Sequence, residues 1–212
     1  MTNTEQLEAE FDRQVANMVS KGYLTHLKLT EAEFKAQIMP LKAKAASLEI
    51  PCVPAGVYLP FVLVVPHTLV PSEAAMEVVN REGKNGIIAL TPRVPTDFRP
   101  TELVKIPENV YLIVNIDRGA KTINVAPDDA LKMLVRLGRS PLTIDEGLAI
   151  ITHYPEYLEK NNCFSLLASR AGDKRVPAIW LSENQPKLGW CWAGNPHTWL
   201  GSASCIQRIG MT

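Results

Sequence analysis

One run of residues constrains the fold more than any other: VYLPFVLVV, the nine positions from Val57 to Val65. It is well short of the roughly 20 apolar residues that a membrane-spanning helix needs. It is rich in β-branched residues and almost continuously apolar, which is typical of a strand buried on both faces. The run therefore predicts a buried β-strand. Pro60 lies inside it and has no amide donor, so we expect this strand at an edge of the sheet or at a bulge.

Two helical patterns precede that strand. Each begins with a threonine and a glutamate three residues later, a capping box in which the two side chains satisfy the first free amides of a helix. The pairs are Thr2 with Glu5 and Thr30 with Glu33. Apolar residues then recur at helical spacing and mark one buried stripe on each helix. The stripes comprise Leu7, Phe11, Val15 and Met18, then Phe34, Ile38, Leu41, Ala45 and Leu48.

Pro40 interrupts the second stripe. Because proline lacks an amide proton and clashes with the preceding turn, we expect it to kink this helix or to divide it after Ile38. The two helices predict an antiparallel hairpin over residues 1–50, an appendage to a single α+β domain that comprises residues 51–212. The hairpin could equally be the arm of a homodimer.

The rest of the chain mixes short strands and helices in an irregular order. Strands are predicted at 86–90, 103–106, 110–116, 122–125, 163–168 and 176–181. Helices are predicted at 73–79, from Pro127 to Gly138, and after a third capping box formed by Thr143 and Glu146. This alternation is too irregular for a βαβ series, and the loop between the last two strands is too short for a parallel crossover. We therefore predict an α+β fold with a mixed or antiparallel sheet flanked by helices.

The charge balance restricts the classes of partner. The chain has 22 Lys and Arg residues against 22 Asp and Glu residues, so its formal net charge is +0. Nucleic-acid-binding proteins usually carry a basic excess that meets the phosphates, so no nucleic-acid partner is expected. No apolar run is long enough to cross a membrane, and the polar N-terminus lacks the pattern of a secretory signal. We therefore expect a cytoplasmic protein with no membrane partner.

The cysteines give no sign of a disulfide framework. The four are Cys52, Cys163, Cys191 and Cys205, and no two have C-x-x-C spacing. In a cytosolic chain of this size, free buried thiols are the simplest interpretation.

The C-terminal segment concentrates aromatic residues. All four tryptophans lie within twenty residues, at positions 180, 190, 192 and 199, and Asn195 and His197 lie among them. Indole walls with a few polar groups are typical of small-molecule pockets, although tryptophans can also simply fill a core. The nearby loop 169–175 contains Arg170 and Arg175, which could hold a carboxylate or phosphate. The predicted ligand-binding residues are Trp190, Trp192, Asn195, His197, Trp199, Arg170 and Arg175.

Catalytic chemistry is a second possibility in the same segment. Cys191, His197 and Cys205 are residue types that bind zinc, but their spacing is irregular. His197 could instead generate a nucleophilic thiolate at Cys191 or Cys205. The chain contains none of the common nucleotide-binding or hydrolase signatures, so no cofactor, metal or catalytic residue is assigned.

Several blocks of the sequence resemble a known family. They are EFDRQVANMVSKGY with LTEAEFKAQIMPL near the start, GRSPLTIDEGLAIITHYPEYL, CFSLLASRAGDKRVPAIWLS, and PKLGWCWAGNPHTWLGSASC. Together they resemble a bacterial, largely actinobacterial family of uncharacterised proteins that share a domain of unknown function. The resemblance implies a bacterial cytosolic protein and supplies no catalytic residues.

Three functional hypotheses follow from the sequence. The first is a small-molecule or peptide-binding domain with a tryptophan-rich pocket and a small anionic or peptide ligand. The second is a Cys/His-dependent or zinc-dependent enzyme. The third is a protein-interaction module that acts through the N-terminal helices. An exposed apolar patch on Leu7, Phe11 and Val15 would favour the third.

Overall fold

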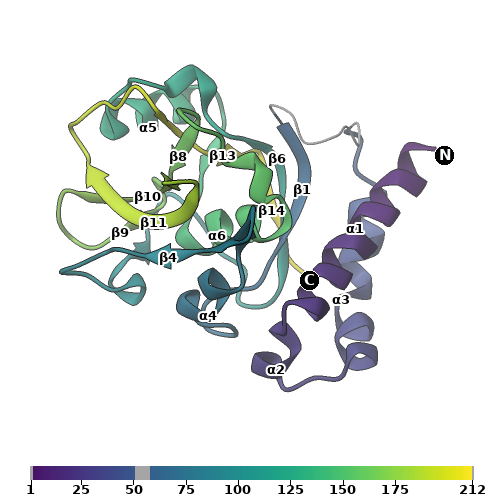
Figure 1. Ribbon diagram of the computed structural model, residues 1–212. Coiled ribbons are helices and arrows are strands. Elements are labelled where there is room, and N and C mark those ends of the chain that lie inside the picture. Colours follow the sequence, from purple (N-terminus) through teal and green to yellow (C-terminus); the bar gives the residue numbers. More distant parts are fainter. Residues whose placement is uncertain (1, 51–57, 212) are drawn as a thin grey trace.

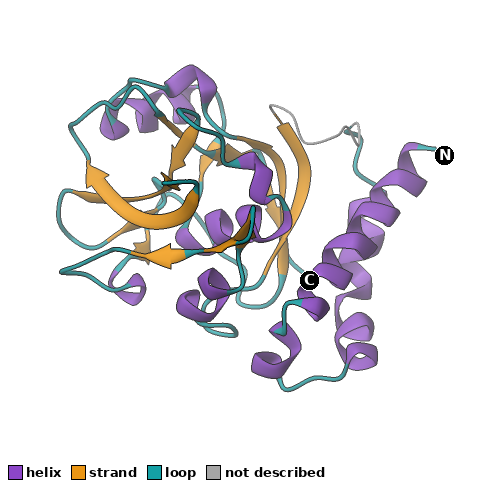
Figure 2. Cartoon of the chain, viewed as in Figure 1, coloured by secondary structure: helices purple, strands orange, loops and turns teal. Residues whose placement is uncertain are grey.

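The computed structural model describes residues 2–50 and 58–211 of the chain. Three helices from the N-terminal segment stand beside a larger body of strands and helices (Figure 1). In Figure 2 the strands occupy the centre of that body, and the N-terminal helices lie along one side of it. The helices are α1 (Asn3–Ser20), α2 (Tyr23–Leu27), α3 (Glu31–Ala46), α4 (Ser72–Glu77), α5 (Pro127–Arg136) and α6 (Ile144–His153).

The strands form two larger sheets, and both confirm the predicted mixed or antiparallel pairing. The first sheet has the order β1 (Tyr58–Val64), β6 (Tyr111–Asp117), β13 (Ser204–Cys205) and β7 (Ser140–Pro141), and β14 (Gln207–Ile209) also pairs with β6. The second has the order β12 (Leu200–Ser202), β8 (Cys163–Ser165), β10 (Arg175–Ser182), β11 (Gln185–Trp192) and β4 (Ile87–Ile88). All pairs of the first sheet are antiparallel, whereas the second is mixed, because β12 is parallel to β8 and β4 is parallel to β11. The fold class is therefore α+β.

Two small ribbons and three 3₁₀ turns complete the architecture. The ribbons pair β2 (Asn80–Arg81) with β3 (Lys84–Asn85) and β5 (Arg99–Pro100) with β9 (Ser169–Arg170). The 3₁₀ turns are η1 (Pro95–Asp97), η2 (Ala120–Thr122) and η3 (Pro155–Tyr157).

The helix starts follow the local sequence. Thr2, Thr30 and Thr143 each accept a hydrogen bond from the backbone of the glutamate three residues later, and each glutamate accepts one from the backbone of its threonine. All three predicted capping boxes are therefore confirmed. The reason is that a capping box depends only on residues within a single turn.

Pro40 does not divide the second long helix. Helix α3 runs without a break from Glu31 to Ala46 with Pro40 inside it, so the expected division after Ile38 is wrong. Pro40 is exposed on the side away from the buried stripe of this helix. On that side water can accept the hydrogen bond that the carbonyl one turn earlier cannot make to proline.

Two predicted strands are absent from the described chain. Residues 103–106 form a loop in which the amide of Val104 donates to the carbonyl of Thr101 and Leu103 is 58% exposed. At 122–125 the Thr122 hydroxyl donates to the Gly119 carbonyl at 2.8 Å and accepts from the Ser202 amide at 2.8 Å. A side chain that bonds to nearby backbone competes with a strand ladder, so η2 forms instead.

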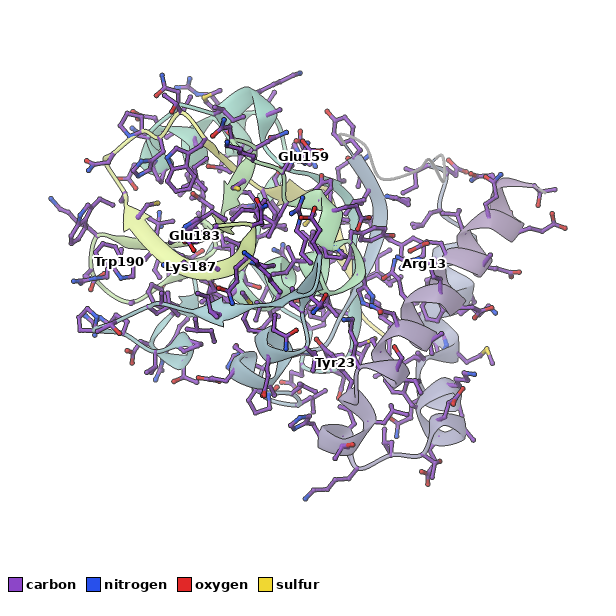
Figure 3. The ribbon with its side chains drawn as sticks, in the orientation of Figure 1. Arg13, Tyr23, Glu159, Glu183, Lys187 and Trp190 are labelled. Carbon is purple, nitrogen blue, oxygen red and sulfur yellow. The ribbon has the colours of Figure 1, made fainter. Side chains whose placement is uncertain are left out.

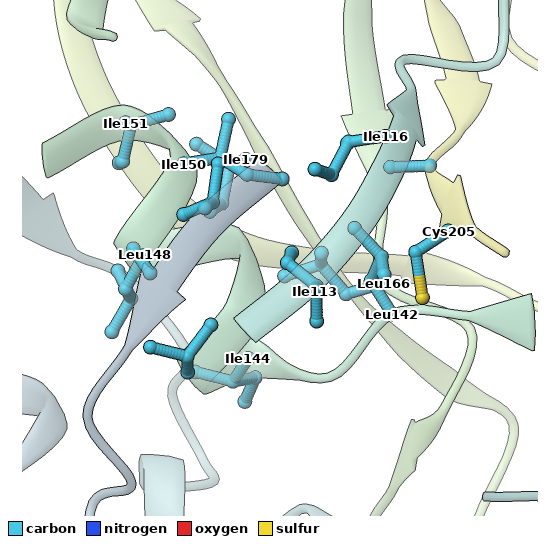
Figure 4. Close-up of a cluster of buried hydrophobic side chains, with 14 of the residues drawn as sticks. Ile113, Ile116, Leu142, Ile144, Leu148, Ile150, Ile151, Leu166, Ile179 and Cys205 are labelled. Atoms are coloured by element: carbon cyan, nitrogen blue, oxygen red, sulfur yellow. The ribbon is translucent and has the colours of Figure 1, made fainter. Parts of the chain in front are cut away.

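Helix α6 lies at the centre of the core. Every residue from Gly147 to His153 is buried, as expected of a helix that is apolar all round. Figure 4 shows its side chains Ile144, Leu148, Ile150 and Ile151 beside Ile113 and Ile116 of β6 and Ile179 of β10. A Cβ atom on Gly147 would lie 2.6 Å from a methyl carbon of Leu166, so only glycine lets the helix approach this closely.

Side chains from two helices form hydrogen bonds with backbone groups on the outer edge of β1. This strand is the last of its sheet, which confirms the edge position expected from Pro60. Gln14 of α1 accepts from the Leu63 amide at 2.7 Å and donates to the Phe61 carbonyl at 3.1 Å. His153 of α6 lies 3.2 Å from the Leu63 carbonyl through Nε2. These side chains take the place of a neighbouring strand and attach the N-terminal helices to the sheet.

His153 makes the stability of this junction depend on pH. The Leu63 carbonyl only accepts, so Nε2 of His153 carries the proton, and Nδ1 accepts from Asn17 at 3.1 Å. Burial, together with the Arg13 guanidinium, lowers the pKa of His153 to about 3. The unfolded chain then binds more protons than the folded chain between pH 6.5 and pH 3, so stability is lost as the pH falls through that window.

We expect the free energy of unfolding to fall by about 2 kcal/mol between pH 7 and pH 5 because of His153 alone. Urea denaturation at both pH values measures it, with His153→Gln as the comparison. His67 contributes with the opposite sign because its pKa is raised, but it is present in both proteins and cancels in the difference. An equal fall in wild type and His153→Gln would contradict the prediction.

Candidate functional site

The four tryptophans form two pairs on opposite faces of the second sheet. Side chains alternate between the faces of a strand. Across the β10–β11 hairpin, Trp190 pairs with Pro177 and Trp192 with Arg175, whereas Trp180 pairs with Lys187. Trp190 and Trp192 therefore share one face and Trp180 lies on the other. The rings of Trp190 and Trp192 are 4.8 Å apart, and the ring of Trp180 is 5.8 Å from that of Trp199.

Arg175 packs against the first pair of indoles. Its guanidinium carbon lies 4.6 Å from the ring centroid of Trp190 and 5.1 Å from that of Trp192. The indole nitrogen of Trp190 donates to the Thr91 carbonyl at 3.1 Å, which fixes that ring, while Trp192 is 42% exposed. Trp190 lies at the end of the molecule opposite Arg13 of helix α1 (Figure 3).

Asp173 connects Arg175 to a segment that is distant in sequence. One carboxylate oxygen accepts from Arg175 at 2.7 Å and from Arg93 at 2.9 Å, and the other accepts from the Arg175 amide at 2.8 Å. This amide and the two guanidinium groups lower the pKa of Asp173 to about 2. We call Arg93, Asp173, Arg175, Trp190 and Trp192 the arginine–tryptophan cluster.

A second pair of arginines lies on the same two segments of the chain, 91–101 and 169–175. Arg99 of β5 and Arg170 of β9 face each other directly in the two-stranded ribbon, although like charges in this position repel. The carboxylate of Asp128 lies 3.6 Å from the Arg170 guanidinium. Burial lowers the pKa of Arg170, and Asp128 opposes that effect.

Three buried polar atoms of this region have no hydrogen-bond partner among the described residues. They are Nη1 of Arg170, Nε of Arg175 and the hydroxyl oxygen of Thr101. A buried N–H group without an acceptor costs on the order of 1–3 kcal/mol. This region of the described chain therefore has more hydrogen-bond donors than acceptors.

His197 and Trp199 lie apart from the cluster, whereas Asn195 lies in the turn that follows Trp192. The rings of His197 and Trp199 are 5.3 Å apart, so His197 belongs with the Trp180–Trp199 pair. Asn195 is exposed in the turn after β11, and its amide donates to the Trp192 carbonyl. Of the predicted residues, the structure thus brings Trp190 and Trp192 together with Arg175, and it joins Trp199 to His197 elsewhere.

The sequence interpretation missed Arg93, Arg99 and Asp173. Arg93 and Arg99 lie in the proline-rich segment 91–100, for which no candidate site residue was predicted. Arg93 and Asp173 are 80 residues apart in the chain. No local motif links them, because the two segments are brought together by tertiary contacts such as the pairing of β5 with β9.

The cysteines are not arranged for nucleophilic chemistry. Cys191 lies on β11 of the second sheet and Cys205 on β13 of the first, and both are buried. Burial raises the pKa of Cys191 and raises that of Cys205 to about 12, which disfavours the reactive thiolate. Cys163, Cys191 and Cys205 are free thiols, as predicted, and Cys52 lies outside the described residues. Within residues 2–50 and 58–211, no three His, Cys, Asp or Glu side chains are grouped to hold a metal ion.

Comparison with known proteins identifies a family. A model of a family described as a family of unknown function (DUF5701) matches residues 17–211. Neither the curated proteins nor the solved structures include a match to the chain. Among the described residues, none of the helices has the length and apolar character to span a membrane.

Proposed function

Since the chain belongs to the DUF5701 family of unknown function, its activity must be inferred from its own residues, and we propose that it binds a small anionic ligand. The binding site is the arginine–tryptophan cluster together with Arg99 and Arg170. The ligand carries a carboxylate or phosphate, as a free small molecule or as part of a peptide. The proposal places this activity in a bacterial cytosol, in line with the sequence resemblance.

A local excess of positive charge carries this proposal. Segments 91–101 and 169–175 together contain five Lys and Arg residues against two Asp residues, whereas the whole chain has a net charge of +0. The strand pairing of β5 with β9 brings these two segments together. Among the described residues, Asp173 alone pairs with both Arg93 and Arg175, so the cluster has more guanidinium donors than carboxylate acceptors there. An anion supplies the missing acceptors, and arginine binds carboxylate and phosphate in a bidentate manner.

Trp192 adds an apolar surface to the charged one. Its exposed indole lies against Arg175, so a ligand can place an apolar or planar group on the ring while its anion meets the guanidinium groups. Binding sites commonly combine such an aromatic wall with a few polar groups. The proposed ligand therefore has a planar or apolar part next to its charge.

The expected result is selective binding of aromatic anions. Phenyl phosphate or benzoate should shift the indole N–H resonances of Trp190 and Trp192, and benzamide, the neutral counterpart of benzoate, should not. The indoles of Trp180 and Trp199 lie on the other face and serve as internal controls. The two anions separate a phosphate from a carboxylate preference. Failure of both anions to shift Trp190 or Trp192, or an equal shift with benzamide, would refute the proposal.

Two variants test whether the anion binds at the arginine–tryptophan cluster. Arg175→Gln should weaken binding of the responding anion about tenfold or more, because a charge-assisted hydrogen bond contributes about 1.5–3 kcal/mol. The matched control is Lys187→Gln, which removes a cation 5.8 Å from the ring centroid of Trp180 on the opposite face. Equal loss in both variants would mean that the anion responds to overall charge and not to the cluster.

The structure gives less support to the other hypotheses. Leu7, Phe11 and Val15, whose exposure would favour an interaction module, are all buried against the core. A Cys/His enzyme would need His197 beside a reactive thiolate, and the pKa values of Cys191 and Cys205 are raised instead.

A further inference from the structure

Helices α1 and α3 lie side by side along one edge of the molecule (Figure 1). Lys42 of α3 donates to both carboxylate oxygens of Asp12 of α1, at 2.8 and 2.7 Å. At the other end of the pair, the Asn3 side chain donates to the Ile50 carbonyl at 3.0 Å. The helices are therefore antiparallel, and these two contacts fix the level of each residue of α1 relative to α3.

A groove with a volume of about 400 Å³ lies between the two helices. Its floor is apolar and comes from Phe11, Val15 and Ile38, each of which is 2% exposed. Met39 of α3 also lines the groove and is 58% exposed, and the exposed Ala16 lines it from α1. The charged lining residues are Asp12, Lys35 and Lys42. A large apolar side chain that stands in the solvent beside an apolar groove is typical of a surface that another chain covers.

The two sides of the groove differ in charge. Asp12 lies on the α1 side, and Glu8 precedes it by one turn on the same face of that helix. Lys35 and Lys42 lie on the α3 side. Lys35 is paired with Glu31 of its own helix at 2.5 Å, which leaves Lys42 as the cation that faces α1. A surface with one acidic and one basic side is complementary to a copy of itself, provided that the acidic side of each copy covers the basic side of the other.

Side-chain size is matched in the same way. Ala16 follows Asp12 by about one turn of α1, and Met39 precedes Lys42 by about one turn of α3. Because the helices are antiparallel, Ala16 and Met39 lie at the same level to within about 1.5 Å, the rise of one residue. Each copy thus offers a large side chain from α3 and a small one from α1 at one level of the groove.

A two-fold axis parallel to the helices satisfies both conditions. A half-turn about such an axis, placed over the groove, sets α1 of the partner over α3 and keeps every residue at its own level. The partner's Asp12 then faces Lys42, so the two copies form a ring of alternating charges. Met39 faces the partner's Ala16, and the two grooves close into one apolar core. An axis across the helices would instead set α1 over α1 and α3 over α3, where like charges repel.

We propose that the chain forms a two-fold homodimer through the groove between α1 and α3, as a four-helix bundle with Met39 in its core. The dimer uses the outer side of the hairpin, whereas the inner side packs against the sheet. Trp190 lies at the end of the molecule opposite α1, so the dimer leaves both arginine–tryptophan clusters open (Figure 3). This proposal does not depend on ligand binding at the cluster.

Sedimentation velocity of the full chain measures the oligomeric state, and wild type should be a dimer at submillimolar concentrations. Met39→Glu should raise the Kd of the dimer by about 100-fold or more, because both copies then place a carboxylate in the apolar core. The matched control is Leu137→Glu, which changes a side chain that is 63% exposed at the end of α5 and should leave the Kd unchanged. Circular dichroism verifies that each variant is folded.

Charge exchange tests the orientation of the two copies. Asp12→Lys gives a dimer interface that contains only cations at this level, and Lys42→Asp gives one that contains only carboxylates, so each variant alone should be monomeric. A mixture of the two variants restores the alternation of charge and should form a heterodimer. A homodimer that persists in both variants would place the interface elsewhere and contradict the proposal.

Two further outcomes would overturn the proposal. The first is a wild-type chain that stays monomeric at submillimolar concentrations, or a dimer that persists in folded Met39→Glu. The second is a monomer that retains a small molecule in native mass spectrometry and loses it in Met39→Glu, which would assign the groove to a ligand. Stability measurements on dilute protein, in which the dimer has dissociated, report the single chain and do not depend on these contacts.

Discussion

Replacement of Arg208 by methionine should lower the free energy of unfolding by about 3 to 5 kcal/mol. Arg208 on β14 and Glu146 on α6 form an ion pair in which the side chains are 7% and 0% exposed. One oxygen of Glu146 accepts from Arg208 at 2.5 Å and from the Tyr111 hydroxyl at 3.0 Å. The other accepts from Arg208 at 2.8 Å and from the Thr143 amide at 2.8 Å. Without Arg208, the core would contain a carboxylate that has lost its counter-charge.

Urea denaturation at neutral pH measures this loss. The control is Lys42→Met, which breaks the exposed pair of Lys42 with Asp12 and should cost less than about 1 kcal/mol. The double variant Glu146→Gln with Arg208→Met should regain part of the stability, because it leaves no unpaired charge. Equal losses from the Arg208 and Lys42 variants would show that the buried pair has no special role.

Replacement of Gln14 by leucine should cost about 2 to 4 kcal/mol. Gln14 is 0% exposed and bonds to the Leu63 amide and the Phe61 carbonyl on the free edge of β1. Leucine has a similar size but can neither donate nor accept, so both backbone groups would be buried without partners. The loss should also loosen the contact between α1 and the sheet.

Urea denaturation of Gln14→Leu and of Gln6→Leu separates this effect from a change in helix propensity. Gln6 lies on the same helix and is exposed, so its substitution should change stability by less than about 0.5 kcal/mol. Hydrogen exchange of the Leu63 amide provides a local measurement, and we expect it to be faster in Gln14→Leu alone. An unchanged exchange rate would mean that another group protects this edge.

The sequence alone determined the features that depend on neighbouring residues. The capping boxes at Thr2, Thr30 and Thr143 specify helix starts, because each needs only one turn of chain. The apolar run at 57–65 specifies the strand β1, since burial of such a run on both faces favours an extended backbone. The sequence also gives the balanced charge of the whole chain. That total does not reveal the local excess of arginine in segments 91–101 and 169–175.

Tertiary structure alone decided which side chains meet. The register of β10 and β11 separated Trp180 from Trp190 and Trp192, although all three are close in sequence. Packing joined His67 to Asp145 across 78 residues and Arg93 to Asp173 across 80. Such pairs leave no local periodicity, because their geometry arises when separate elements pack around α6. Helix starts and strands are short-range properties of this chain, whereas the proposed anion-binding site is a long-range one.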